Sequence, residues 1–200
     1  MKIVAIVQAR MGSTRLPGKA LKLITGKAMI EILLSRLSLS KEINKIVVAI
    51  PESEDNNLLQ LAVESLGFSC YRGSEKDVLN RFYNSAKFVS ADVIVRITGD
   101  CPLVDSILVD ECIKGYKNSN VDYFSNTDPA TYPDGLDIEV MSFESIERAN
   151  NETDSDFDRE HVTPYIRNSD SFSKASMHYI EDLSNQRWSV DEPEDLVVVT

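Results

Sequence analysis

The sequence predicts an α/β fold in which helices cover both faces of a mostly parallel sheet. Three nearly continuous apolar runs, at residues 2–8, 45–50 and 92–98, have the length and the β-branched composition of strands buried on both faces. Between the strands lie stretches in which apolar side chains recur at helical spacing. This alternation is typical of three-layer α/β/α folds. No internal repeat or linker interrupts it, so we expect one domain over residues 1–200.

In the first part of the chain, local signals bound the expected elements. The run Lys2–Gln8 leads into a loop with glycines, Pro51 ends the second strand, and Gly67 ends the following helix, which Ser53 or Asp55 could cap. We expect strands at residues 2–8, 45–50, 68–71, 92–98 and 121–124, and helices at residues 28–39, 53–66, 77–89 and 107–116.

Beyond residue 125 the alternation becomes irregular, and we expect strands of mixed direction. A polar loop at 125–135 is followed by expected strands at 136–141, 172–179 and 187–190 and by helices at 142–150, at 159–167 and from Pro193. The acids Asp154, Asp156 and Asp158 have the spacing of the first ligands of an EF-hand calcium loop. Such a loop requires Gly at its sixth position and Glu at its twelfth, and both are absent here, so we expect a solvated loop. The chain stops at Thr200 inside its last expected helix, which leaves room for the natural protein to continue.

Charge is distributed unevenly along the chain. The formal net charge is −11, which argues against nonspecific nucleic-acid binding. Residues 1–30 contain six Lys and Arg residues and no acid, which makes this segment +6 and leaves −17 for the remainder. An isolated basic segment in an acidic chain indicates either a specific site for a polyanion such as phosphate or a solvated basic face.

The composition gives no sign of secretion or of a membrane span. No run of eighteen apolar residues is present, and the apolar run Ile3–Val7 is too short for a signal peptide. Cys70, Cys101 and Cys112 are odd in number and match no zinc pattern, so we expect free thiols. We therefore expect a cytoplasmic protein with no membrane partner.

The loop at 8–20 directly follows the first strand, where open α/β sheets bind ligands. Its glycines, Gly12 and Gly18, allow the backbone to approach a ligand, and its cations would neutralise phosphate charge. These cations are Arg10, Arg15 and Lys19. The loop is not a Walker A motif, because five residues separate its glycines and no hydroxyl residue follows the lysine. We predict a phosphate site of another type; the alternative is an ordinary basic turn.

Six separated motifs resemble, in order, those of the cytidylyltransferases that activate acidic sugars. They are RMGSTRLPGK at 10–19, RGSEKDVLNRF at 72–82, RITGDCPL at 96–103, YPDGLDIE at 132–139, REHVTPYI at 159–166 and VDEPEDL at 190–196. This family includes the enzymes that make CMP-sialic acid and CMP-KDO (3-deoxy-manno-octulosonate), and the nearest branch is that of spore-coat polysaccharide biosynthesis. The resemblance implies a GT-A, Rossmann-like nucleotide-binding domain, CTP as the nucleotide and Mg²⁺ as the cofactor. It is compatible with a homodimer.

Two acids are candidate metal ligands. Asp100 follows the strand at 92–98, on the sheet edge that carries the basic loop, and a carboxylate beside a triphosphate suits Mg²⁺. In the family, the Asp of the Gly-Asp-x-Pro motif that matches Asp100 is a metal ligand. The resemblance implies the same role for Asp191, the acid of the VDEPEDL motif near the C-terminus. Both acids could instead be turn or cap residues, Asp100 before Pro102 and Asp191 before the helix from Pro193.

The remaining candidates come chiefly from the resemblance. It implies nucleotide binding by Ala9, Arg10, Gly12, Ser13, Arg15 and Lys19, and by Arg72, Gly73, Ser74 and Arg81 near the base or ribose. The acceptor sugar is expected near Tyr132, Asp134, Asp137 and Glu139. Strand alternation places Asp137 and Glu139 on one face, which points either at the site or at solvent. His161 is either a sugar contact or a packing or capping residue.

The hypothesis is nucleotidyl transfer, in which a sugar hydroxyl attacks the α-phosphate of CTP in line and pyrophosphate leaves. Arg10, Lys19 and Asp100 would be the catalytic residues, with Mg²⁺ on Asp100 and Asp191. One alternative is a GT-A glycosyltransferase that uses a nucleotide-sugar donor, disfavoured because Gly-Asp-Cys-Pro stands where Asp-x-Asp is expected. The other is a noncatalytic nucleotide-binding regulator. The sequence does not identify the sugar.

Overall fold

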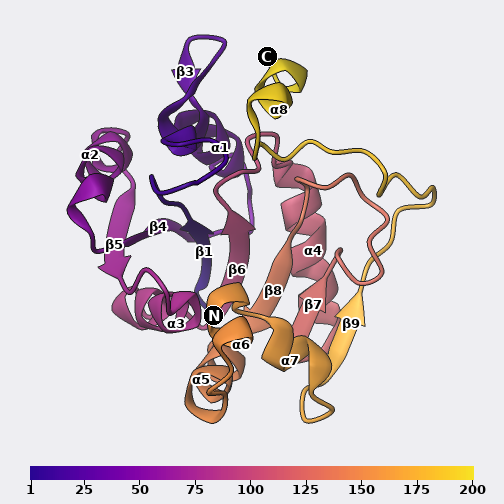
Figure 1. Cartoon of the computed structure of the whole chain (residues 1–200). Coiled ribbons are helices and arrows are strands. Elements are labelled where there is room, and N and C mark those ends of the chain that lie inside the picture. Colours follow the sequence, from indigo (N-terminus) through magenta and orange to yellow (C-terminus); the bar gives the residue numbers. More distant parts are fainter.

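Seven strands form one sheet in the computed structural model, which describes residues 1–200. They are β1 (Ile3–Gln8), β4 (Lys45–Pro51), β5 (Ser69–Gly73), β6 (Val93–Thr98), β7 (Tyr123–Ser125), β8 (Glu139–Ser142) and β9 (Lys174–Ser176). Their order across the sheet is β5-β4-β1-β6-β8-β7-β9 (Figure 1). All neighbours are parallel except those of β8, which runs antiparallel to both β6 and β7. The predicted α/β fold with a mostly parallel sheet and a mixed C-terminal part is confirmed.

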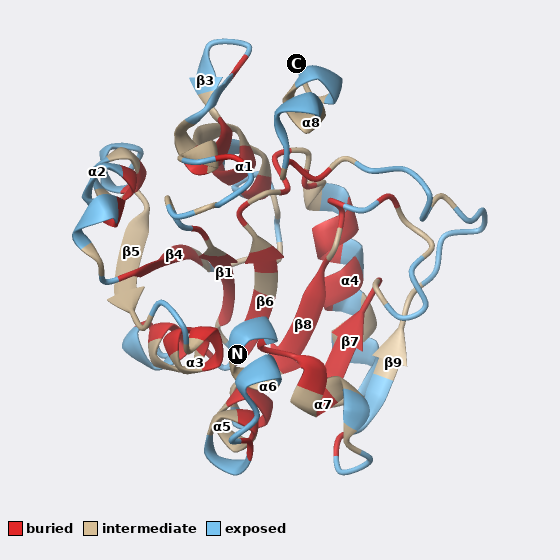
Figure 2. Ribbon diagram, viewed as in Figure 1, coloured by how far each residue is buried: buried red, intermediate tan, exposed pale blue.

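Helices pack on both faces of the sheet because alternate residues of a buried strand point to opposite sides. One layer consists of α1 (Met29–Leu37), α2 (Asn57–Ser65) and α4 (Ser106–Ser119), and the other contains α3 (Val78–Phe88), α5 (Phe143–Glu152) and α7 (Pro164–Asn168). Ala5 and Val7 of β1 face the first layer, and Val4 and Ile6 face the second. Buried residues accordingly concentrate on the strands and on the helix faces toward them (Figure 2). No helix has both the length and the apolar character needed to cross a bilayer.

The strand order reverses between β1 and β6. The chain runs outward from β1 through β4 to β5 and then crosses back over β1 to β6. The carboxyl ends of β1 and β6 therefore border a crevice, which is the usual ligand site of open α/β sheets. Gly99, directly after β6, allows the two strand ends to meet closely, since a Cβ there would lie 2.6 Å from the carbonyl oxygen of Gln8.

The helix expected at 159–167 is two helices, and the first of them begins earlier. Ser155 caps α6 (Asp156–His161), and the acids in its first turn favour a helix N-terminus, so the expected solvated loop at 154–158 is partly helical. Pro164 lacks the N–H needed to continue α6. Val162, with φ 74° and ψ −56°, joins the two helices in a γ-turn closed by a bond of 2.9 Å from Thr163 N to His161 O.

Other C-terminal elements also differ from the expectation. β8 and β9 are shorter than the predicted runs, and no strand forms at 187–190, which makes a single bridge between Asp134 and Arg187. That segment is held instead by loops, with Trp188 N donating to Asp134 O and Val190 N to Asp100 O. The last helix, α8 (Pro193–Val198), stops before Thr200, so the expectation that Thr200 lies inside a helix is wrong. The short hairpin of β2 (Leu23–Ile24) and β3 (Lys27–Ala28) and the 3-10 turns at Lys19–Leu21 and Glu54–Asn56 were not expected.

Candidate active site

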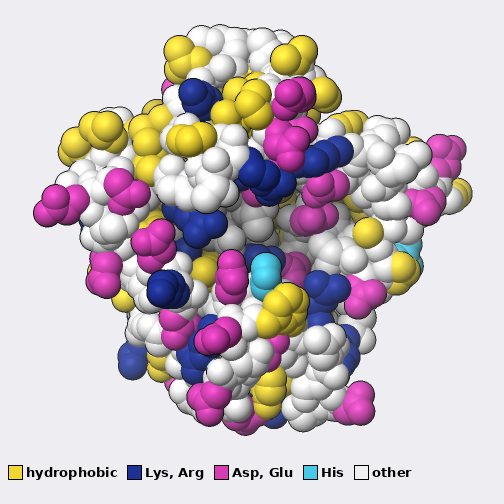
Figure 3. All heavy atoms as spheres, in the orientation of Figure 1, with side chains coloured by type: hydrophobic (Ala, Val, Ile, Leu, Met, Phe, Trp, Pro, Cys, Tyr) yellow, Lys and Arg dark blue, Asp and Glu magenta, His cyan; other side chains and the backbone are white.

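A cleft of about 300 Å³ opens at the crevice between β1 and β6. Its walls come from the loop after β1, from α3, from the end of β6 and the loop after it, from α6 and from the segment before α8. Figure 3 shows a hollow at the centre of this face with Lys and Arg side chains gathered round it. Nine residues predicted from the sequence line the cleft, namely Ala9, Arg10, Ser13, Arg15, Lys19, Arg81, Asp100, His161 and Asp191.

The loop after β1 is folded back on itself and tied to the C-terminal segment. Gly18, with φ 69°, turns the chain into the 3-10 turn Lys19–Leu21, and its N–H donates to Met11 O at 3.0 Å. Leu16 is buried in a small apolar cluster that also contains Val190. These contacts fix the backbone on either side of the loop's cations.

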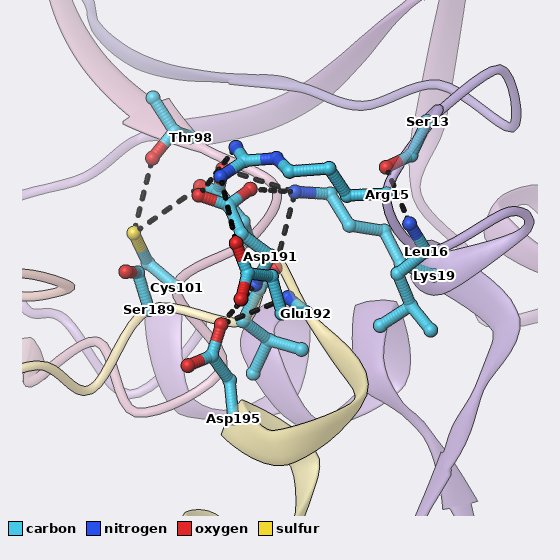
Figure 4. A network of polar contacts seen from close by, with 12 residues as sticks. Ser13, Arg15, Leu16, Lys19, Thr98, Cys101, Ser189, Asp191, Glu192 and Asp195 are labelled. Carbon is cyan, nitrogen blue, oxygen red and sulfur yellow. Dashed lines mark hydrogen bonds and ion pairs between the residues drawn. The ribbon is translucent and has the colours of Figure 1, made fainter.

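The ammonium of Lys19 joins the two acids predicted as metal ligands. Lys19 Nζ donates to Asp191 Oδ1 at 2.8 Å, to Asp100 Oδ2 at 3.2 Å and to Val190 O at 3.1 Å. Its side chain is only 14% exposed, and charge-assisted bonds are strongest where water is excluded. Figure 4 shows Lys19 and Arg15 reaching from the N-terminal loop toward Asp191. Residues from three distant parts of the sequence therefore meet at one point.

Asp191 lies among three cations. Besides its bond to Lys19, its carboxylate pairs with Arg15 at 2.9 Å and with Arg187 at 3.3 Å. Partial burial by itself would raise the pKa of Asp191, but the hydrogen bond from Lys19 and the charges of Lys19, Arg15 and Arg187 outweigh burial and hold the pKa below its ordinary value. Asp191 is therefore held in its ionised form.

Neither predicted metal ligand caps a helix. Asp105 caps α4 with its carboxylate, and Glu192 caps α8 in a capping box with Asp195. Asp100 lies in the turn after β6, as one alternative expected, but the alternative that either acid caps a helix is wrong, and both acids line the cleft.

The donor set of Asp100 and Asp191 fits a divalent cation that keeps water or phosphate ligands. Their two carboxylates come from separate loops and already converge on one cation, the Lys19 ammonium. The structure contains no group of three or more His, Cys, Asp or Glu residues placed to hold a metal. Mg²⁺ is commonly bound in this way, through one or two carboxylates together with substrate phosphates and waters.

Arg81 contributes a buried cation to the opposite wall. Its guanidinium donates to the carbonyl oxygens of Ser74 and Glu75, and its Nε has no partner. Burial, together with the positive charge of Arg10, lowers the pKa of Arg81 to about 10. The carboxylates of Glu75 and Asp77 offset this shift only in part, so the two neighbouring cations favour an anionic ligand at this wall.

Several predicted nucleotide-binding residues lie beside the cleft lining. The guanidinium of Arg72 donates to Asn57 Oδ1, Gln60 Oε1 and two carbonyl oxygens before α2, and so ties β5 to that helix. Gly73 supports the wall, because a Cβ there would lie 3.1 Å from Arg81 Cγ. The structure places Gly12 and Ser74 outside the lining as well. Ligand contact by these four residues stays a prediction.

A second cavity of about 270 Å³ adjoins the cleft and shares Thr98 and His161 with it. Asp137 and Glu139 line this cavity, together with Arg96 of β6 and Arg167 of α7. The alternative that the face of Asp137 and Glu139 is an exposed strand face is therefore wrong. His161, the last residue of α6, packs on Phe157 at 4.5 Å between ring centroids and borders both cavities.

The two acids of the second cavity differ in their surroundings. Glu139 is buried, pairs with Arg96 and accepts a hydrogen bond from the Tyr123 hydroxyl. Burial alone would raise the pKa of Glu139, but Arg96 holds it below its ordinary value. Burial, together with the nearby charges of Asp134, Glu139 and Asp100, raises the pKa of Asp137 to about 6.

Tyr132 and Asp134 line neither of these cavities. Tyr132 packs on Tyr179 with ring centroids 5.4 Å apart, and Asp134 accepts a bond of 2.7 Å from Ser189 Oγ. Both brace the C-terminal segment that presents Asp191, and sugar contact by either stays a prediction.

Sequence reasoning missed several residues that line the site or pair with its acids. They are Gln8, Thr14, Arg96, Thr98, Thr163, Arg167 and Arg187. Arg96 carried a readable signal, since a cation inside a buried apolar strand requires a buried partner. The sequence contains no such signal for Arg187, because the contact of Arg187 with Asp191 depends on the turn that precedes α8.

Comparison with known proteins agrees with this geometry. The cytidylyltransferase family profile matches residues 4–192. The chain is 47% identical to an uncharacterized protein of Methanocaldococcus jannaschii, over 83% of this chain and 67% of that protein. It is 37% identical to the spore coat polysaccharide biosynthesis protein SpsF of Bacillus subtilis, over 83% of this chain and 70% of SpsF. A solved cytidylyltransferase of Leptospira borgpetersenii superposes with a TM-score of 0.93 at 33% identity, over 98% of this chain and 83% of the other. The resemblance stated from the sequence is confirmed, and the chain belongs to the cytidylyltransferase family.

Proposed function

We propose that this protein transfers CMP from CTP to a hydroxyl of an acidic sugar and releases pyrophosphate. The observation that carries the proposal is the convergence of Lys19, Asp100 and Asp191 at the strand-order reversal, beside a second cavity of sugar size. A triphosphate in the cleft would lie against the basic loop, and an acceptor in the second cavity would reach it past Thr98.

On the nucleotide side, the protein supplies positioned positive charge. Arg10, Arg15 and Lys19 would exchange their present surroundings for phosphate oxygens and stabilise the departing pyrophosphate. Asp100 and Asp191 would hold Mg²⁺, which would supply Lewis-acid stabilisation of the phosphate charge.

On the acceptor side, Arg167 is the cation of the second cavity that has no close carboxylate partner. Arg96 is neutralised by Glu139. Arg167, by contrast, has only a distant pairing of 3.8 Å with Asp128, whose carboxylate is mostly exposed. A sugar carboxylate could bind the guanidinium of Arg167 through two parallel hydrogen bonds. The product would be an activated sugar for surface polysaccharide or glycan assembly in the cytoplasm, a role that the likeness to SpsF supports.

The test is a pyrophosphate-release screen of the four nucleoside triphosphates against a panel of acidic sugars with Mg²⁺. We expect release from CTP only when an acidic sugar is present. Transfer from a nucleotide-sugar donor without pyrophosphate would instead identify a glycosyltransferase. Binding of CTP without turnover on any sugar of the panel would favour a regulator and contradict the proposal.

Arg167→Gln should raise KM for the acidic sugar about 10- to 100-fold, because a charge-assisted bond contributes roughly 1.5–3 kcal/mol. KM for CTP should be unchanged, since Arg167 does not line the nucleotide cleft. The matched control is Arg148→Gln, which removes an exposed arginine paired with Glu152 on α5. Steady-state kinetics with the acidic sugar and its carboxamide analogue check the assignment. An equal loss for both acceptors would contradict carboxylate recognition by Arg167.

A further inference from the structure

Of the two acids that line the second cavity, Glu139 has donors and Asp137 has none. Asp100 and Asp191 bind Lys19, Glu139 binds Arg96, and Asp134 accepts from Ser189. The side chain of Asp137 is half-buried, accepts no hydrogen bond and forms no ion pair. An acid that is partly desolvated and left without a partner costs stability, so its position at a cavity wall calls for a functional explanation.

The fold places Asp137 where the two cavities meet. The antiparallel ladder of β6 with β8 ends at the pair Arg96 and Glu139, and Thr98 and Asp137 lie two residues beyond this pair on their respective chain segments. Thr98 lines both cavities, and Asp137 lines the second of them. Asp100, two residues beyond Thr98, is near enough for its charge to act on Asp137. An acceptor hydroxyl that passes from the second cavity toward the cleft therefore passes Asp137.

Building on the proposed function, we propose that Asp137 is the general base that takes the proton from the attacking sugar hydroxyl. As the hydroxyl oxygen forms its bond to the α-phosphorus of CTP, the proton moves to a carboxylate oxygen of Asp137. The bond between the α-phosphorus and the bridging oxygen breaks, and pyrophosphate leaves with that electron pair. Asp137 then releases the proton to water.

The electrostatic surroundings of Asp137 suit this role. Burial and the charges of Asp134, Glu139 and Asp100 raise the pKa of Asp137 to about 6, while Arg96 opposes the shift. A base of this strength is ionised at neutral pH and accepts a proton more readily than an ordinary aspartate. The other titratable or charged side chains that face it are Cys101 in the loop after β6, and His161 and Arg167 across the cavity.

Asp137→Asn tests the proposal, with turnover, CTP affinity and the pH profile as readouts. We expect kcat to fall roughly 10²- to 10⁴-fold, the usual contribution of a positioned base, while the Kd for CTP and the half-saturating Mg²⁺ concentration stay unchanged. In the wild type, kcat/KM should fall tenfold per pH unit below about pH 6, and this acid limb should be absent in the variant. A shifted Mg²⁺ requirement would overturn the proposal in favour of a metal ligand.

Two further variants separate a base from a structural role. Asp137→Ala should regain part of its turnover when formate is added, whereas Asp137→Asn should not, because only the alanine leaves room for a small carboxylate. His161→Gln should keep the acid limb near pH 6, since His161 is the histidine that lines both cavities and is the rival candidate for the base. Loss of the limb in His161→Gln, or absence of formate rescue in a folded Asp137→Ala protein, would overturn the assignment.

The outcomes distinguish failure of this inference from failure of the proposed function. If the wild type releases no pyrophosphate from CTP with any acidic sugar, the proposed function itself is wrong. If the wild type is active and Asp137→Asn retains its turnover and its acid limb, only the role of Asp137 is wrong. Asp170→Asn, which removes an exposed carboxylate outside both cavities, serves as the matched control.

Discussion

Lys19→Met should lower turnover by roughly a hundredfold or more, the scale of loss for one preorganised electrostatic group. The ammonium of Lys19 is nearly buried and lies between Asp100 and Asp191, so it is positioned before any ligand arrives. A triphosphate in the cleft would offer this ammonium phosphate oxygens as acceptors, and the two carboxylates would then be free to hold a divalent cation. Asp100→Asn should lose turnover on the same scale. Pyrophosphate release from CTP with a saturating acidic sugar measures both effects.

The control for Lys19→Met is Lys22→Met, which removes the same charge from the same basic segment at an exposed position outside the cleft. If the segment acts only through its overall positive field, both variants should lose activity alike. If position matters, Lys22→Met should retain wild-type turnover. Near-wild-type turnover in a folded Lys19→Met protein would remove Lys19 from the catalytic residues.

The first half of the fold and the basic loop were predictable because their signals are local. The apolar runs that became β1, β4 and β6 and the glycines that follow β1 are read within a few residues of one another. Parallel strands then bring their carboxyl ends to one edge, so the meeting of Arg10, Lys19 and Asp100 follows from strand order. Asp191 required the resemblance, because nothing near it in the sequence indicates that it returns to this edge.

The C-terminal part was less predictable because long-range contacts determine it. The segment at 187–190 has the pattern of a strand, yet its N–H groups bond to the carbonyls of Asp134 and Asp100 in separate loops. Pro164 did carry a local signal, and reading it strictly would have divided the helix expected at 159–167. The second cavity depends on the register between β6 and β8, which pairs Arg96 with Glu139 across 43 residues of sequence. That register cannot be read from either strand alone.

Glu139→Leu should lower the free energy of unfolding by about 3–5 kcal/mol, because it leaves the Arg96 charge without its partner in the interior. It also removes the acceptor of the Tyr123 hydroxyl. Glu139 has a lowered pKa in the folded protein, so its contribution is present above the pKa of an unfolded glutamate, about 4.3. This contribution is lost as the pH falls through the folded value. Urea denaturation at pH 7, repeated across the acid range, measures both effects.

Two further variants test whether the loss of stability in Glu139→Leu comes from the buried Arg96–Glu139 ion pair. Glu152→Gln removes the partner of Arg148 in an exposed pair and should change stability by less than about 1 kcal/mol. The double variant Arg96→Met/Glu139→Leu should recover much of the stability that Glu139→Leu loses, since apolar side chains of similar volume often replace a buried ion pair at little cost. If Glu139→Leu alone unfolds with wild-type stability, the Arg96–Glu139 pair does not hold β6 and β8 together. In that case the wall that presents Asp137 and Thr98 depends on other contacts.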